Sequence, residues 1–181
     1  MDGKLFFEQM NPDFFNREYI RQIDNEHVYE EQALDLREYA PDALSIPVPG
    51  HITFGYFEGD LGELQASVAL VNEEWLKFYQ DSRRVFCAFD GERPVSFCRV
   101  EDMGEHEIFG RKVKIGGPGC VGTIPAYRRQ GIGLKMVQYA TNILKSEGYD
   151  YSYIHYTGVG HWYARLGYET LVRWNKYGPV D

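Results

Sequence analysis

The sequence predicts an α/β fold in which strands and helices alternate along most of the chain. Three patterns carry this prediction. Short apolar runs typical of strands begin at residue 51, a hairpin signal joins two of them around residues 90–93, and a long amphipathic pattern over 132–147 separates two further strands. The 181 residues are 44% hydrophobic, which is ample for a buried core. The length indicates one domain, or one domain with an extension.

The first 50 residues have the least regular pattern. Residues 14–39 are rich in Glu, Arg and Gln, and their apolar residues keep only a loose helical spacing. Pro41, Pro47 and Pro49 then interrupt regular structure. We expect residues 1–50 to be an N-terminal helical extension packed on a domain of residues 51–181.

The pattern is clearer from residue 51 to residue 115. Residues 52–57 are typical of a strand, and Asp60 is placed to cap a helix over 61–79. That helix would bury one face, because its apolar residues recur at steps of three and four: Leu64, Val68, Val71, Trp75 and Phe78. The next predicted elements are a hairpin of strands 84–89 and 94–100, followed by a strand over 112–115.

The C-terminal third alternates between strands and helices. Gly148 is placed to end the long helix, and Gly167 to end the short one. The predicted elements are a glycine-rich strand over 119–124 ended by Pro125, a helix over 132–147, a strand over 151–156, a short helix over 161–166, and a strand over 168–174.

Composition excludes several classes of protein. The formal net charge of −8 does not match the basic face of a nucleic-acid binder, so no nucleic-acid partner is expected. The acidity favours solubility, or else a cationic substrate such as an amine. Three unevenly spaced cysteines do not match a disulfide framework, and no metal site is expected. We see no signal peptide and no apolar stretch long enough for a membrane span, so we expect a cytoplasmic protein with no membrane partner.

The turn Arg128-Arg129-Gln130-Gly131-Ile132-Gly133 opens the long helix after a strand. The first amides of a helix have no internal hydrogen-bond acceptors and lie at the positive end of the helix dipole. Glycine allows a ligand to approach the backbone closely, and two arginines add positive charge. The turn therefore predicts an anion site suited to a phosphate or diphosphate. A simple glycine-containing turn is the alternative.

This segment resembles motif A of the GNAT superfamily of N-acetyltransferases. In that family an apolar strand, often ending in Pro, leads into Gln/Arg-x-x-Gly-x-Gly/Ala and a long helix, and Arg128, Gly131 and Gly133 match those positions. A second family pattern, Tyr-x-x-x-Gly-Phe/Tyr, follows motif A along the chain, as it does in the family. Residues Tyr163 to Tyr168 match it here. The resemblance covers about residues 51–177.

The resemblance implies a mixed, mostly antiparallel sheet flanked by helices, with a splayed strand pair that binds acyl-CoA. The cofactor would be acetyl-CoA, held by the backbone of one strand along the pantetheine and by the helix turn at the diphosphate. The implied cofactor-binding residues are Val121, Gly122, Thr123, Arg128, Arg129, Gln130, Gly131, Ile132, Gly133 and Leu134. The family often has Asn near Tyr156 or Thr157, and this chain does not.

The implied reaction is direct attack of an amine on a thioester. Tyr163 matches the tyrosine from which the family commonly protonates the departing thiolate. Alkyl amines are mostly protonated at neutral pH, so a proton acceptor is also needed. The motif A strand has no carboxylate between Gly116 and Ile124, which leaves Glu101, Asp102 and His155 as candidate bases.

Several alternatives stay open. The first hypothesis is an N-acetyltransferase that acts on a primary amine of a small molecule or peptide. The second is a non-catalytic acyl-CoA-binding regulatory module, which the missing strand carboxylate favours. A longer acyl group, an acyl intermediate on Cys120 and a homodimer are further possibilities. The sequence does not identify the acceptor.

Overall fold

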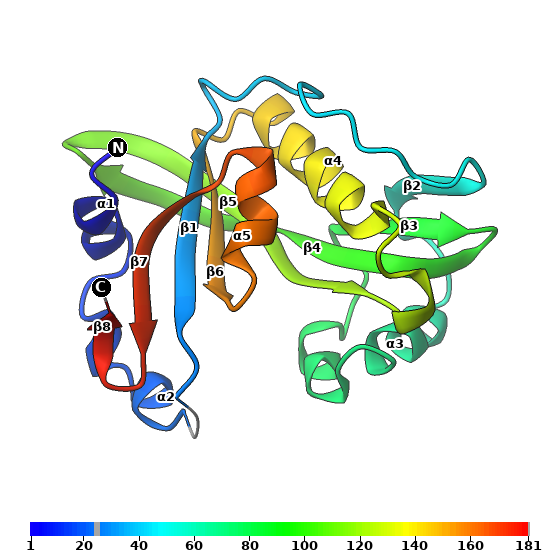
Figure 1. Cartoon of the computed structure of the whole chain (residues 1–181), viewed down its shortest axis with the longest axis horizontal. Coiled ribbons are helices and arrows are strands. Elements are labelled where there is room, and N and C mark those ends of the chain that lie inside the picture. Colours follow the sequence, from blue (N-terminus) through cyan, green and yellow to red (C-terminus); the bar gives the residue numbers. More distant parts are fainter. Residues whose placement is uncertain (24–25, 181) are drawn as a thin grey trace. The chain divides into compact units, whose positions relative to one another are not determined.

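The computed structural model describes residues 1–23 and 26–180 (Figure 1). Within them, eight strands form one sheet in the order β2-β3-β4-β5-β6-β1-β7-β8. The β5–β6 pair is parallel, and the other registered pairs are antiparallel. The strands are β1 Tyr29–Asp35, β2 Ile52–Tyr56, β3 Val85–Asp90, β4 Arg93–Ile108, β5 Arg111–Thr123, β6 Tyr151–Thr157, β7 Glu169–Asn175 and β8 Gly178–Val180.

The helices include several single turns. The α-helices are α1 Gly3–Met10, α2 Glu18–Arg21, α3 Leu61–Ala69, α4 Ile132–Ser146 and α5 Gly160–Tyr163. Short 3₁₀ helices are η1 Phe14–Asn16, η2 Glu73–Phe78, η3 Pro125–Tyr127 and η4 Ala164–Leu166. No helix in the described part of the chain is both long and apolar enough to cross a membrane.

The chain divides into two compact units. The first unit comprises residues 1–39, 103–116 and 148–181, and the second comprises residues 40–102 and 117–147. The long strands β4 and β5 contribute residues to both units. Each unit has its own hydrophobic core and is described by itself below.

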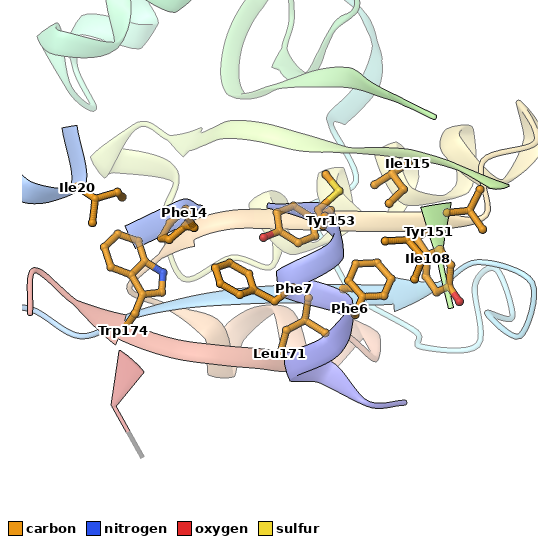
Figure 2. Packing of buried hydrophobic residues seen from close by; sticks show 13 residues of the cluster. Phe6, Phe7, Phe14, Ile20, Ile108, Ile115, Tyr151, Tyr153, Leu171 and Trp174 are labelled. Carbon is orange, nitrogen blue, oxygen red and sulfur yellow. The ribbon is translucent and has the colours of Figure 1, made fainter. Parts of the chain in front are cut away.

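Aromatic residues dominate the core of the first unit, as Figure 2 shows. Phe6 of α1 packs edge-on to Tyr151 of β6, with ring centroids 4.9 Å apart, and Phe14 packs edge-on to Trp174 of β7 at 5.1 Å. Gly3 lies so close to β7 that an added Cβ would come within 2.9 Å of the Leu171 Cα. Burying one such ring stabilises the fold by roughly 1.5–3 kcal/mol, so the N-terminal residues are part of this core.

Residues from α3, the β3–β4 hairpin and the start of α4 form the core of the second unit. Leu64 and Val68 are fully buried, as the apolar spacing of this helix predicts. The hairpin turns at Gly91, whose φ is +59°. Such a left-handed backbone suits glycine, because it has no Cβ.

The mixed, mostly antiparallel sheet with flanking helices is confirmed, and so are most predicted elements. The predicted helix over 61–79 is wrong in its second half. It ends after Ala69, and Asn72 caps a separate 3₁₀ helix by accepting a hydrogen bond from Glu74 N. The predicted strands 112–115 and 119–124 are parts of one strand, β5, and β8 was not predicted.

The expectation of a helical N-terminal extension needs a correction. The helical part ends at Arg21, and β1 follows it as a strand between β6 and β7. Pairing with two neighbours outweighs the weak local preference of this Glu-rich segment. The boundary between residues 50 and 51 stays a prediction.

Candidate functional site

The turn before α4 leaves a row of backbone donors without acceptors. Arg129 and Gly131 both have left-handed backbones, with φ of +63° and +77°. The first bond of the helix runs from Lys135 N to Gly131 O at 2.9 Å. Within the described residues, the amides of residues 129–134 donate to no backbone or side-chain acceptor. Six successive N–H groups are therefore available to a ligand.

The surroundings of this turn favour an anion. No side chain caps α4, and its first turn contains no acidic residue. Arg128 and Arg129 are exposed, and Arg128 Nε donates to Thr123 O at 2.9 Å, which ties the turn to the end of β5. The positive end of the helix dipole adds to these charges. The donor set therefore fits the oxygens of a diphosphate.

Gly131 is held in place by the segment that crosses it. A Cβ at this position would come within 2.5 Å of Pro47 O, and the positive φ would strain any other residue. A glycine is thus required here for two independent reasons. Ile132, Gly133 and Leu134 are buried beneath the turn, whereas Gln130 is exposed.

Val121, Gly122 and Thr123 form the end of β5. A Cβ on Gly122 would lie 2.6 Å from the Phe97 ring, so packing alone explains this glycine. Ser96 of β4 donates to Gly122 O at 2.8 Å and lies 2.8 Å from Thr123 Oγ1. Hydrogen bonds to β4 therefore fix the end of the strand that leads into the turn.

Cys120 has a left-handed backbone within β5, just before these residues. The φ of Cys120 is +48°, and the buried Tyr79 hydroxyl donates to Cys120 O at 2.7 Å. Burial, and next the charge of Glu101, raise the pKa of the Cys120 thiol to about 11. A thiol with such a pKa is almost wholly protonated at neutral pH, which disfavours an acyl-cysteine route.

Glu101 lies on β4, and its carboxylate faces β5. A Cβ added to Gly119 would meet the Glu101 carboxylate oxygen at 2.7 Å. The neighbouring strand therefore places a carboxylate beside β5, which has none of its own between Gly116 and Ile124. The Glu101 side chain is 40% exposed, and Arg99 Nε lies 3.7 Å from it.

His155 lies on β6 in the first unit and contacts a carboxylate that sequence reasoning missed. Its Nδ1 is 2.7 Å from Oε2 of Glu31, which is fully buried on β1. Glu31 escaped notice because β1 was predicted to be helical. The position of this glutamate in a strand that pairs on both sides becomes visible only in the structure.

Tyr163 ends α5, also in the first unit. Its side chain is 6% exposed, and its ring packs against Trp162 and Tyr168 at centroid distances of 4.9 and 6.0 Å. Gly167 then ends the turn with φ of +96°. The Tyr-x-x-x-Gly-Tyr pattern thus forms a compact aromatic turn before β7.

The predicted residues fall into two groups. The second unit contains Glu101 and the whole predicted cofactor-binding segment from Val121 to Leu134, whereas the first unit contains Tyr163 and His155. Among the residues that the structure describes, no group of three or more His, Cys, Asp or Glu side chains could hold a metal ion.

Comparison with a family model bears on these groups. A model described as an acetyltransferase (GNAT) domain matches residues 60–171, which is more than half of the chain. The match includes the turn before α4, Glu101, His155 and Tyr163. No curated protein matches the chain.

Solved structures with the same fold are distant in sequence. One is described as a GCN5-related glucosamine N-acetyltransferase region in a fungal multi-domain GH3 β-N-acetylglucosaminidase, with a TM-score of 0.65 and 24% identity over 81% of this chain and 20% of that one. A GCN5-related N-acetyltransferase from Sphaerobacter thermophilus has a TM-score of 0.58 and 21% identity over 82% of this chain and 50% of that one. A third, from Kribbella flavida, has a TM-score of 0.51 and 20% identity, covering 81% and 55%. The chain thus spans little more than half of these proteins at most, and the likeness shows the fold alone.

Proposed function

This chain belongs to the GNAT family of acetyltransferases, and from that premise we propose that it moves an acetyl group from acetyl-CoA to a primary amine. The acceptor would be a small molecule or a peptide. The free amides of residues 129–134 are the observation that carries the proposal. An uncapped helix end beside two arginines supplies several donors and positive charge to one diphosphate.

In this proposal each group along the chain has a distinct task. The backbone of Val121, Gly122 and Thr123 would bind the pantetheine arm, and one of its amides would polarise the acetyl carbonyl as negative charge develops on the oxygen. Arg128 and Arg129 would add charge at the diphosphate. Acetyl-CoA supplies an activated acyl group, and the protein orients it and manages the protons.

The reaction forms a C–N bond and breaks a C–S bond. Tyr163 is the proposed acid that protonates the departing thiolate, because a phenol carries a suitable proton. Glu101 and His155 are both candidates for the base that takes a proton from the ammonium. Overall, one ammonium proton is released to solvent.

A non-catalytic acyl-CoA-binding module is the competing function. It rests on the missing carboxylate between Gly116 and Ile124. The position of the Glu101 carboxylate against Gly119 weakens this argument, because a carboxylate need not belong to β5 itself to act beside it. Tight cofactor binding without any turnover would favour the module.

Two measurements test the proposal. Calorimetry should detect binding of coenzyme A. Pantetheine should bind more weakly, because it lacks the diphosphate. Thiol release from acetyl-CoA should then be screened over a panel of primary amines. The panel should include glucosamine, since the similar fungal structure is described as a glucosamine N-acetyltransferase region. Equal affinity for both ligands, or no thiol release with any amine, would contradict the proposal.

A substitution at Tyr163 tests the assigned acid. We expect Tyr163→Phe to lower kcat by about 10²-fold or more while the Kd for coenzyme A stays unchanged. Tyr168→Phe is the matched control, because Tyr168 belongs to the same aromatic turn and its hydroxyl contacts Ser152 of β6. Normal turnover of the Tyr163 variant would reject the role.

A further inference from the structure

Glu31 is a buried carboxylate that accepts four hydrogen bonds. Its Oε2 receives the Tyr153 hydroxyl at 2.6 Å and His155 Nδ1 at 2.7 Å. Its Oε1 receives the backbone N of Tyr156 at 3.0 Å and Trp174 Nε1 at 2.9 Å. The side chain has no exposed surface, and its partners belong to β6 and β7, the two strands that flank β1.

The four partners match an ionised carboxylate. An ionised carboxylate is an acceptor only, with about four lone-pair sites. A backbone amide and an indole N–H can only donate, so both must point at Oε1. The pKa of Tyr153 is raised well above its usual range by burial and next by the charge of Glu31, which agrees with a negative neighbour. The Glu31 carboxylate is therefore held in a fixed orientation, with Oε2 as the hydrogen-bond acceptor for His155 Nδ1.

This acceptor determines where His155 carries its proton. In the neutral imidazole one ring nitrogen is a donor and the other an acceptor. A carboxylate at 2.7 Å from Nδ1 requires the proton on Nδ1, which leaves the lone pair on Nε2. Nε2 has no hydrogen-bond partner among residues 1–23 and 26–180, and the side chain is 38% exposed.

The other groups around His155 hold the ring and add little charge. The Phe14 ring of η1 meets it edge-on at 5.9 Å, and Tyr153 stacks on it at 6.5 Å. Tyr156 lies at 5.9 Å, and its pKa is raised, first by burial and then by Tyr29. Arg17 lies over the Phe14 ring and lowers the pKa of Tyr153. The carboxylate of Glu31 is in direct contact with the imidazole.

We infer that Glu31 is a positioning residue that keeps His155 protonated on Nδ1, so that Nε2 can accept the proton of the attacking ammonium. This inference rests on the proposed acetyl transfer. One proton passes from the ammonium nitrogen to Nε2 before the C–N bond forms. When the C–S bond breaks, the departing thiolate takes a proton from Tyr163, and the new amide nitrogen releases its second proton, which restores Tyr163 through solvent. His155 then releases the ammonium proton to solvent, so that one proton is released overall.

His155 and Glu101 differ in their charged neighbours. Arg99 Nε lies 3.7 Å from the half-exposed Glu101 carboxylate, whereas His155 Nδ1 contacts the buried carboxylate of Glu31 at 2.7 Å. A histidine titrates in the range where a proton can be both accepted and released near neutral pH. The pair of His155 and Glu31 therefore assigns the base that the resemblance left open.

The isosteric change Glu31→Gln separates positioning from packing. The amide oxygen of Gln must face the two obligatory donors, Tyr156 N and Trp174 Nε1, so its NH₂ group faces Tyr153 and His155. The Tyr153 hydroxyl can rotate to accept. His155 can accept only through Nδ1, which moves the ring proton to Nε2 and removes the lone pair that the reaction needs.

The first readout is the tautomer of His155, recorded by ¹⁵N NMR of histidine-labelled protein without any ligand. We expect the Nδ1-protonated form in the wild type and the Nε2-protonated form in Glu31→Gln. Tyr153→Phe is the matched control: it removes a donor to the same oxygen but leaves His155 in contact with Glu31, so the wild-type tautomer should persist. An unchanged tautomer in Glu31→Gln would overturn the inference.

The second readout is kcat, measured with acetyl-CoA and the best amine of the panel. Glu31→Gln should lower kcat by about 10²- to 10⁴-fold with an unchanged Kd for coenzyme A. Tyr153→Phe should retain most of the activity, and Glu101→Gln, measured in parallel, tests the competing base. A loss of equal size in Tyr153→Phe would mean that Glu31 is only structural, and a loss confined to Glu101→Gln would assign the base to Glu101.

Two further outcomes are distinguishable. If Glu31→Gln does not fold, His155→Gln still tests whether His155 is the base, at a half-exposed site. His51→Gln is its control, because His51 also lies near a carboxylate, that of Asp90. Full activity of His155→Gln would refute the inference. If the wild type acetylates no amine, the proposed function fails, whereas the tautomer spectrum still decides whether Glu31 positions His155.

Discussion

Two helices of the second unit, α3 and α4, begin in opposite ways. Asp60 caps α3, because its carboxylate accepts a hydrogen bond from Gly62 N at 2.8 Å, and Glu63 adds negative charge in the first turn. At the start of α4, Gly131 has no side chain to offer, and the first turn contains no acid. The first amides of both helices lack helical acceptors, and of the two helices α3 has a side chain that accepts from one of them.

The difference shows that α4 lacks the stabilisation of a side-chain cap, and that the backbone amides at its start stay available to a ligand. A side-chain cap contributes about 1 kcal/mol, and α4 does without it. Its buried face compensates, since Met136, Val137, Ala140 and Leu144 are all fully buried. Three kinds of substitution can break or sharpen this comparison.

The largest effect is expected at Gly131. Gly131→Ala should lower the free energy of unfolding by at least about 1–2 kcal/mol from the left-handed backbone alone, and further from the 2.5 Å approach to Pro47 O. Gly148→Ala is the control, because Gly148 has φ of +79° but no atom within 4 Å of the added Cβ. Urea unfolding of both variants measures the difference. Equal losses would show that the crossing segment does not constrain the turn.

A change of charge at Arg129 should separate binding from stability. Arg129→Asp brings the missing acid to the start of α4, which should stabilise the helix by about 0.3–1 kcal/mol. The same charge should repel a diphosphate and weaken coenzyme A binding by about tenfold or more. Asp tolerates the φ of +63° at this position. Calorimetry and urea unfolding should thus change in opposite directions, and Arg111→Asp, at another exposed arginine, should leave binding unchanged.

The smallest effect is expected at α3. Asp60→Ala should cost about 1 kcal/mol of folding stability, because Gly62 N loses its acceptor. Asp60→Asn should retain nearly all of that stability, since Asn is an equally good cap. The Kd for coenzyme A should be the same in both variants. A weaker affinity in Asp60→Ala would contradict the view that only α4 is left open for the ligand.

The elements that were predicted correctly are governed by neighbouring residues. The hairpin at Gly91 and the helix over 132–146 depend on turn residues and on apolar spacing within one segment. The backbone donors before α4 can also be predicted from neighbouring residues. The strand, the glycine turn and the start of the helix all lie within one short segment. The sequence alone therefore predicts the anion site and, through its two motifs, the family.

Only the tertiary structure decided the features that join distant segments. β1 is a strand because β6 and β7 pair with it on both sides, although its own residues favour no such state. The role of Glu31 depends on its hydrogen bonds with Trp174 and His155, which lie more than 120 residues further along the chain. Glu101 reaches Gly119 only across the β4–β5 pair. Local patterns cannot encode such contacts, because strand pairing satisfies hydrogen bonds between residues that have no fixed spacing in sequence.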